Sequence, residues 1–101
     1  MPDPDLNFPV TVTVQIGNTD NKLSQREWHD FTCEVHADCA RCGNLHFSGY
    51  SPSNAEWQNA CYVISVKSAE RLDLLRTLLK AARKIYRQDS IAIVCGNVSF
   101  V

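Results

Sequence analysis

Apolar residues recur with two different periods along the chain, and the two periods predict its strands and helices. In residues 10–16 (VTVTVQI) every second side chain is apolar, which is typical of a strand with one buried face. Residues 45–50 (LHFSGY) and 60–66 (ACYVISV) predict two more strands, and residues 90–101 (SIAIVCGNVSFV) contain the last one, with a kink at Gly96. The pattern therefore predicts four short strands.

The first helix has a complete start signal. Ser24 and Glu27 form an S-x-x-E capping box, and Leu23 and Trp28 occupy the two positions of a hydrophobic staple. Gly43 is typical of the residue that follows a helix, so we expect this helix to end beside it. A stripe at helical spacing is predicted to face the core: Trp28, Phe31, Val35, Cys39 and Cys42.

The second helix is predicted from a cap at Ser68 to about Arg87, with a wide apolar face of leucines and alanines. The order is then strand, helix, strand, strand, helix, strand, without a repeat or a linker. Residues 1–9 contain three prolines and are predicted to form an extended N-terminal arm, which leaves 10–101 as one domain. Right-handed crossovers make this order an α+β, ferredoxin-like βαββαβ fold, with two helices on one face of a four-stranded antiparallel sheet.

The segment HADCARCGNLH (36–46) raises the question of a metal or redox site. His36, Cys39, Cys42 and His46 could supply four zinc ligands, with Cys33 in reserve. However, Cys39 and Cys42 continue the predicted core stripe, and a CxxC pair at a helix C-terminus is not stabilised as thiolates. We favour core packing over zinc binding and redox chemistry, and we expect no metal and no cofactor.

The charge is unevenly distributed. Residues 1–66 carry three basic and eight acidic residues, whereas residues 67–101 carry seven basic and three acidic ones. An RNA-recognition domain shares the predicted order, but its exposed strand positions carry stacking aromatics, where this chain has Thr11, Thr13 and Gln15. We therefore do not expect nucleic-acid binding.

No apolar run is long enough to cross a membrane, and residues 1–9 lack the features of a signal peptide. We therefore expect a cytoplasmic protein, with no membrane partner. Five cysteines, an odd number, argue against a closed disulfide framework.

The predicted topology brings three polar loops to one end of the molecule: 17–23, 50–59 and 87–90. Together with the start of the first helix they would suit a partner loop or a small, nucleotide-like anion, held by Lys22 and Arg87 and stacked on Trp57 or Tyr50. The alternative is that the loops are polar only because loops are exposed. The candidate ligand- or partner-binding residues are Asn18, Asp20, Asn21, Lys22, Tyr50, Trp57, Gln58, Asn59, Arg87, Gln88 and Asp89. The opposite end offers little besides Gly43, Asn44, Lys67 and Ser68.

The two helices carry opposite charges. The first has an acidic stripe, which consists of Glu27, Asp30, Glu34 and Asp38. The second has a basic outer face, the candidate charged docking face, which consists of Arg76, Lys80, Arg83 and Lys84. This face is either simply solvated or a docking surface for an acidic partner or a second copy of the chain. The face of the sheet without helices is also partly apolar, which makes a homodimer a further possibility.

Three blocks, IGNTDNKLSQREW (16–28), WQNACY (57–62) and YRQDSIA (86–92), resemble a family of small uncharacterised proteins from actinobacteria and their bacteriophages. The resemblance implies no activity. A phage origin would imply an accessory protein that acts in the cytoplasm of a bacterial host. We therefore predict a non-catalytic interaction protein that binds a host factor or complex. The alternatives are a small-ligand protein that uses the loop end and, less favoured, a small enzyme with Asp20 or Asp89 as base.

Overall fold

Seven elements follow one another along residues 5–101, the part of the chain that this computed structural model describes. They are β1 (Val10–Gly17), the 3-10 turn η1 (Thr19–Asn21), α1 (Gln25–Cys42), β2 (Asn44–Tyr50), β3 (Asn59–Val66), α2 (Ala69–Ile85) and β4 (Ala92–Asn97). The order confirms the βαββαβ prediction.

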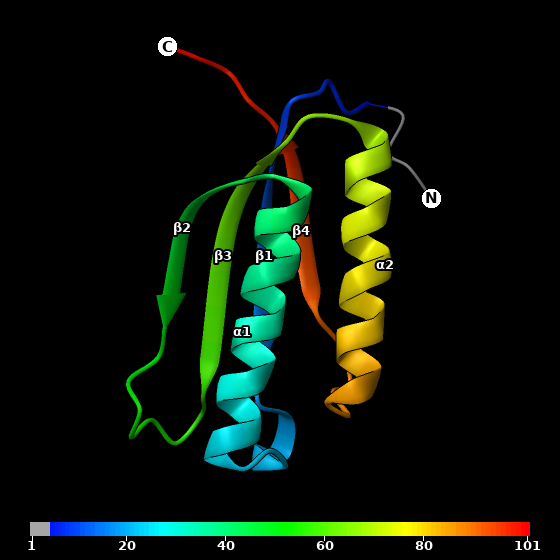
Figure 1. Cartoon of the computed structure of the whole chain (residues 1–101). Helices are drawn as coiled ribbons and strands as arrows, with labels where there is room; N and C mark the ends of the chain where they lie inside the picture. Colours follow the sequence, from blue (N-terminus) through cyan, green and yellow to red (C-terminus); the bar gives the residue numbers. More distant parts are fainter. Residues whose placement is uncertain (1–4) are drawn as a thin grey trace.

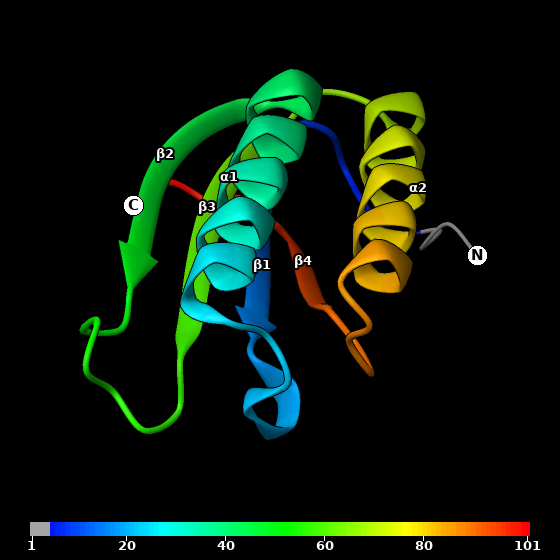
Figure 2. The ribbon, with the colours of Figure 1, turned by 60° about the horizontal axis from the view of Figure 1, so that its bottom comes forward.

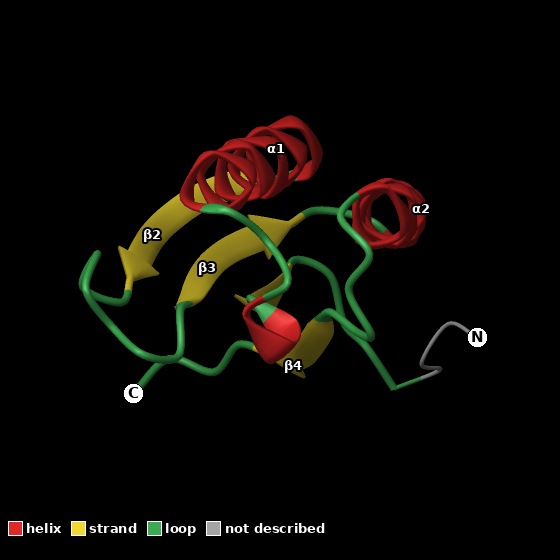
Figure 3. Cartoon of the chain, turned by 90° about the horizontal axis from the view of Figure 1, so that it is seen from below, coloured by secondary structure: helices red, strands yellow, loops and turns green. Residues whose placement is uncertain are grey.

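The strands form one antiparallel sheet in the order β2-β3-β1-β4. Both helices lie on the same face of this sheet (Figures 1 and 3). The fold is therefore α+β and ferredoxin-like, as predicted. None of the helices in residues 5–101 is long and apolar enough to cross a membrane.

The predicted arm lies partly outside the described residues, since the description begins at Asp5. The arm contacts the end of β4: the Asn7 amide donates to Asn97 Oδ1, and Asn97 Nδ2 donates to the Asp5 carbonyl. Leu6 and Phe8 pack against the core. The described part of the arm is thus attached to the domain.

The alternation in β1 places Val10, Val12, Val14 and Ile16 in the core, as predicted. Residues 60–66 are apolar at almost every position, so their pattern does not indicate a buried face; in the structure β3 buries the even positions, among them Tyr62, which is fully buried. Tyr62 donates its hydroxyl proton to the Thr32 carbonyl of α1 at 3.0 Å, so its only polar atom is satisfied. The other side of the sheet has no helix over it. We call it the open sheet face; it presents Thr11, Thr13, Gln15, Phe47, Cys61, Val63, Ser65, Ala92 and Val94.

Helix α1 begins as predicted, because Ser24 and Glu27 form both hydrogen bonds of the capping box. Its end differs from the usual pattern. Gly43 is extended (φ −161°), so it is not needed for a left-handed turn. A Cβ at this position would instead collide with the carbonyl oxygen of Ser65. Glycine is thus required here by close packing of α1 against β3.

The second helix ends at Ile85, two residues earlier than expected, and Arg87 turns the chain with φ 55°. The last strand, β4, lies within residues 90–101, as expected. Asp38 differs more clearly: it was expected on the exposed acidic stripe but is only 6% exposed. Its position three residues after Val35 and four before Cys42 places it on the buried side of α1.

Candidate functional site

The three predicted loops do meet at one end of the molecule (Figure 2). The backbone amide of Asn18 donates to the carbonyl of Gln58 at 3.0 Å, and the amide of Thr19 donates to Gln88 Oε1 at 2.9 Å. A salt bridge between Lys22 and Asp89, at 3.7 Å, links the first loop to the third. The juxtaposition inferred from topology is therefore present.

Three amides in this end are buried and form hydrogen bonds within the protein. Asn18 bonds the backbone of Leu23 in both directions and also donates to Gln58 Oε1. Gln58 exchanges hydrogen bonds with Gln25 of α1. Gln88 accepts from Thr19, as above, and donates to the carbonyl of Tyr86. These amides hold the loops together, because a buried amide without partners would be costly.

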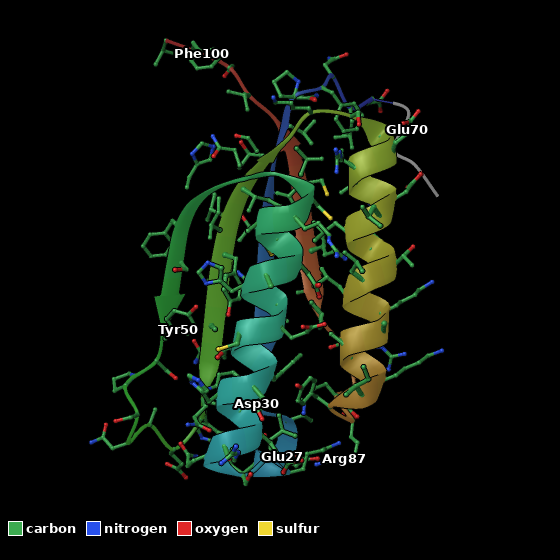
Figure 4. The ribbon with its side chains drawn as sticks, viewed as in Figure 1. Glu27, Asp30, Tyr50, Glu70, Arg87 and Phe100 are labelled. Carbon is green, nitrogen blue, oxygen red and sulfur yellow. The ribbon has the colours of Figure 1, made fainter. Side chains whose placement is uncertain are left out.

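Both cations expected to hold an anion are paired with carboxylates. Arg87 donates to Glu27 Oε2 at 2.9 Å (Figure 4), and Lys22 faces Asp89. The hydrogen bond from the Ser24 backbone, and after it the hydrogen bond from Arg87, lowers the pKa of Glu27. The start of α1 thus already has a carboxylate from its own first turn, which complements the helix dipole.

The two candidate aromatics are not stacked together. Tyr50 lies at the end of β2 (Figure 4), edge-on to Tyr62 with ring centroids 5.8 Å apart. Trp57 is 65% exposed. Asp20, Asn21 and Asn59 are exposed, and the first two have positive φ angles. These three side chains are therefore accessible from outside, although the Asn59 amide donates to the Trp57 carbonyl.

A hollow of about 520 Å³ opens beside these loops on the open sheet face. Of the candidate residues only Asn59 lines it, together with Gln15, Thr19 and Ser90, and no charged side chain of residues 5–101 is among its lining residues. Its chemistry is that of a neutral polar surface. It offers no charge to an anionic ligand.

The charged docking face forms part of a second concavity. Arg76, Lys80 and Arg83 line a groove of about 340 Å³ between α2 and β4, which we call the α2–β4 groove. Lys84, on the same helix, is exposed and does not line it. Residues that the sequence did not single out complete the walls: Leu79, Ser90, Ile91 and Ile93, together with the loop residue Asp89. In the sequence, Ser90, Ile91 and Ile93 were marked only as part of the segment 90–101, and Leu79 only as part of the apolar face of the second helix. The tertiary structure brings these residues together beside the cations.

The predicted core role of Cys39 and Cys42 is confirmed, since both are buried. Burial, with a smaller effect of Asp38, raises the pKa of Cys39 to about 12, so this thiol stays protonated at neutral pH. His46 lies elsewhere, on the open sheet face, where it hydrogen-bonds Ser65 Oγ at 2.6 Å. Within residues 5–101, no three His, Cys, Asp or Glu side chains group in a way that could hold a metal ion.

Comparisons with known proteins bear on the fold. No family model and no curated protein matches the chain. Among solved structures, the chain is similar to a dimeric ferredoxin-like protein from an uncultured marine organism, with a TM-score of 0.50 and 13% identity over 91% of this chain and 89% of that one. At this identity the likeness supports the ferredoxin-like fold alone.

Proposed function

We propose that this chain is a non-catalytic interaction protein that binds an acidic segment of another protein in the α2–β4 groove. The observation that carries the proposal is that cations and apolar side chains line the same groove. Arg76, Lys80 and Arg83 are its cations, Leu79, Ile91 and Ile93 are its apolar residues, and Asp89, paired with Lys22, is the one acidic residue among the described residues that line it. Within residues 5–101, none of these three cations has a salt-bridge partner. Arg83 donates one hydrogen bond to the Gln88 carbonyl, but a carbonyl does not neutralise its charge, so the charge of the three cations is available to a partner.

The strand beside the groove supports an extended partner. β4 is an edge strand of the sheet, and its sequence AIVCGN contains no charged residue and no proline. The other edge strand, β2, is irregular between Leu45 and Phe47. Edge strands without such protection pair readily with an added strand, whose alternate side chains then enter a neighbouring groove. A partner segment in which acidic and apolar residues alternate would place its carboxylates near the cations of the groove and its apolar side chains near Leu79 and Ile93.

The resemblance to actinobacterial and phage proteins extends this proposal. We infer that the chain is a phage accessory protein, that it acts in the cytoplasm of the bacterial host, and that its partner is a host protein. A small-anion function at the loop end has less support, because Lys22 and Arg87 are paired with Asp89 and Glu27.

We expect the Lys80→Glu variant to lose the host partner and the Lys84→Glu variant to keep it. Both substitutions change the charge of the same helix by the same amount, one turn apart, but only Lys80 lines the groove. Reversing a charge that faces an acidic partner should weaken binding by about tenfold or more. The measurement is a pull-down from actinobacterial lysate at low salt, followed by a binding titration with the protein identified.

The dependence of binding on salt is a further control. The amount of host partner that the native chain retains should fall at about 0.5 M salt, because salt screens the attraction between the cations of the groove and the acidic segment. Equal retention by both variants, or capture of a protein without an acidic segment, would remove the support for the groove as the binding surface.

We also propose that two copies of the chain associate through the open sheet face. The residues that define this face include no Asp, Glu, Lys or Arg; His46, which hydrogen-bonds Ser65, lies on it as well, and Phe47 and Val94 are 56% and 60% exposed. An uncharged, partly apolar face can meet its own copy about a twofold axis without repulsion. The ferredoxin-like protein that the chain resembles is itself described as dimeric.

Sedimentation velocity tests this association. The native chain should sediment as a dimer, and Val94→Asp should sediment as a monomer, because each interface would then bury two carboxylates. Ile85→Asp is the matched control: Ile85 is 65% exposed, lies on α2 away from the sheet face, and should not alter the dimer. If the native chain is still a monomer at a protein concentration of about 100 µM, the proposed dimer is contradicted.

A further inference from the structure

The end of the molecule opposite the loops contains a cluster of cations that the sequence did not reveal. Arg41 from the last turn of α1, Lys67 from the β3–α2 connection and Arg71 from the first turns of α2 line one hollow of about 410 Å³. Gly43 and Asn44 complete its lining. This end was expected to offer little besides Gly43, Asn44, Lys67 and Ser68. We call the concavity the α1–α2 hollow.

The Cys42 thiol lies close enough to both Arg41 and Arg71 to be affected by their charges. This thiol is only 3% exposed and belongs to the core. Burial and the charge of Asp38 raise its pKa, and the charges of Arg71 and Arg41 both oppose that rise. Two cations thirty residues apart in sequence thus affect one buried atom. The fold has brought them together.

These cations have no salt-bridge partner among the described residues. Within residues 5–101, none of Arg41, Lys67 and Arg71 forms a salt bridge, and no acidic side chain lines the hollow. Glu70 is next to Arg71 in sequence but is exposed and outside the lining (Figure 4). Asp38 lies one helical turn before Arg41, but it is buried. Three like charges held close together are unfavourable unless an anion joins them.

We infer that the α1–α2 hollow binds a phosphate-type anion with two or more negative charges, such as a pyrophosphate group. Arginine side chains bind phosphate oxygens through pairs of parallel N–H donors, and lysine adds a compact charge. A volume of about 410 Å³ lies within the range of small-molecule sites. This inference does not rest on the proposed function, which concerns the α2–β4 groove.

The close packing of Gly43 gives the hollow a fixed wall. Because the glycine lies against the Ser65 carbonyl, the end of α1 cannot move away from β3 without opening a gap. Arg41 therefore starts from a helix end that is held against β3. Such preorganisation lowers the cost of binding a small anion.

The test is a calorimetric titration of the full chain with inorganic pyrophosphate, with ionic strength held constant by potassium chloride. We expect saturable binding that Arg71→Gln and Arg41→Gln each weaken by about tenfold, because each removes a charged contact. Circular dichroism of both variants checks that they fold. The two arginines belong to different helices, so a structural change caused by one substitution would not account for weaker binding in both variants.

Arg87→Gln is the matched control. It removes one positive charge at the other end of the molecule, where the sequence predicted an anion site, and it should leave pyrophosphate binding unchanged. Loss of binding in Arg87→Gln but not in Arg71→Gln would overturn the inference and assign the anion to the loop end. Absence of binding by the native chain, or equal binding by all variants, would also overturn it.

A second titration with ADP identifies the source of the phosphate group. Binding of ADP that is tighter than that of pyrophosphate, and weakened in the same way by Arg71→Gln, would support the hollow as a site for a nucleoside diphosphate. Equal affinity would support a site for the inorganic anion. A tight ADP site that is insensitive to Arg71→Gln would contradict the assignment.

Discussion

The Asp38→Asn variant is expected to be more stable than the native chain at pH 7.5, by about 2 kcal/mol. Asp38 is 6% exposed, and its Oδ2 atom has no hydrogen-bond partner within residues 5–101. Burial, and after it the charge of Glu34, raises its pKa from 3.8 to about 6, while Arg41 partly opposes this. The folded protein therefore holds a carboxylate that it does not solvate well. An uncharged amide of the same shape avoids that cost.

The sign of the pH dependence follows from the raised pKa. Between pH 3.8 and about 6 the folded state binds this proton and the unfolded state releases it. The free energy of unfolding of the native chain should thus fall as the pH rises through this range, by up to about 3 kcal/mol from this one group. The contribution is fully present below pH 3.8 and is lost above pH 6.

Urea unfolding of the native chain and the variant at pH 4.5 and 7.5 measures the effect. The two curves should lie closest at pH 4.5 and diverge by about 2 kcal/mol at pH 7.5. Asp30→Asn is the control, because Asp30 is an exposed carboxylate on the same helix (Figure 4). A variant of Asp38 with the same pH dependence as the native chain would refute the raised pKa.

The second large effect is expected for Gly43→Ala, which should lower the free energy of unfolding by about 3 kcal/mol. The backbone of Gly43 is extended and accepts any residue, so conformational strain is not the reason. The added methyl group would instead meet the Ser65 carbonyl and approach Val66. Since these atoms belong to a central strand and the core, α1 would have to shift.

Gly96→Ala is the matched control, because a Cβ there meets no atom within 4 Å. It should change stability by less than about 0.5 kcal/mol. Urea unfolding of both variants at one pH is the measurement. Similar stability of the two variants would mean that α1 and β3 can separate at little cost. The α1–α2 hollow would then have no fixed wall at Gly43.

Local signals accounted for the elements of the fold. The capping box at Ser24 and the alternation in β1 involve residues within a few positions of one another, so they can be recognised without coordinates. The meeting of the three loops also followed, because the order of elements and the handedness of crossovers leave few arrangements. Gly43 was recognised as the residue after the first helix. The reason why glycine is needed there, its contact with the Ser65 carbonyl, was missed because Ser65 is far away in sequence.

The chemistry of the surface was less predictable. Asn18, Gln58 and Gln88 had the composition of a binding loop, yet their amides hold the loops together through partners that are distant in sequence. Lys22 and Arg87 were assigned to an anion, but Asp89 and Glu27 lie beside them. Conversely, Arg41 and Arg71 looked like ordinary helix residues, and only the packing of α1 beside α2 made them neighbours.

The sequence by itself determined the four strands, the two helices and their order, because hydrophobic period and capping depend on near neighbours along the chain. Tertiary structure decided which face of β3 is buried, which charges are paired and which remain available, and which end of the molecule gathers unpaired cations. These properties depend on distances between residues far apart in sequence, and electrostatic and hydrogen-bond energies change steeply over a few ångströms.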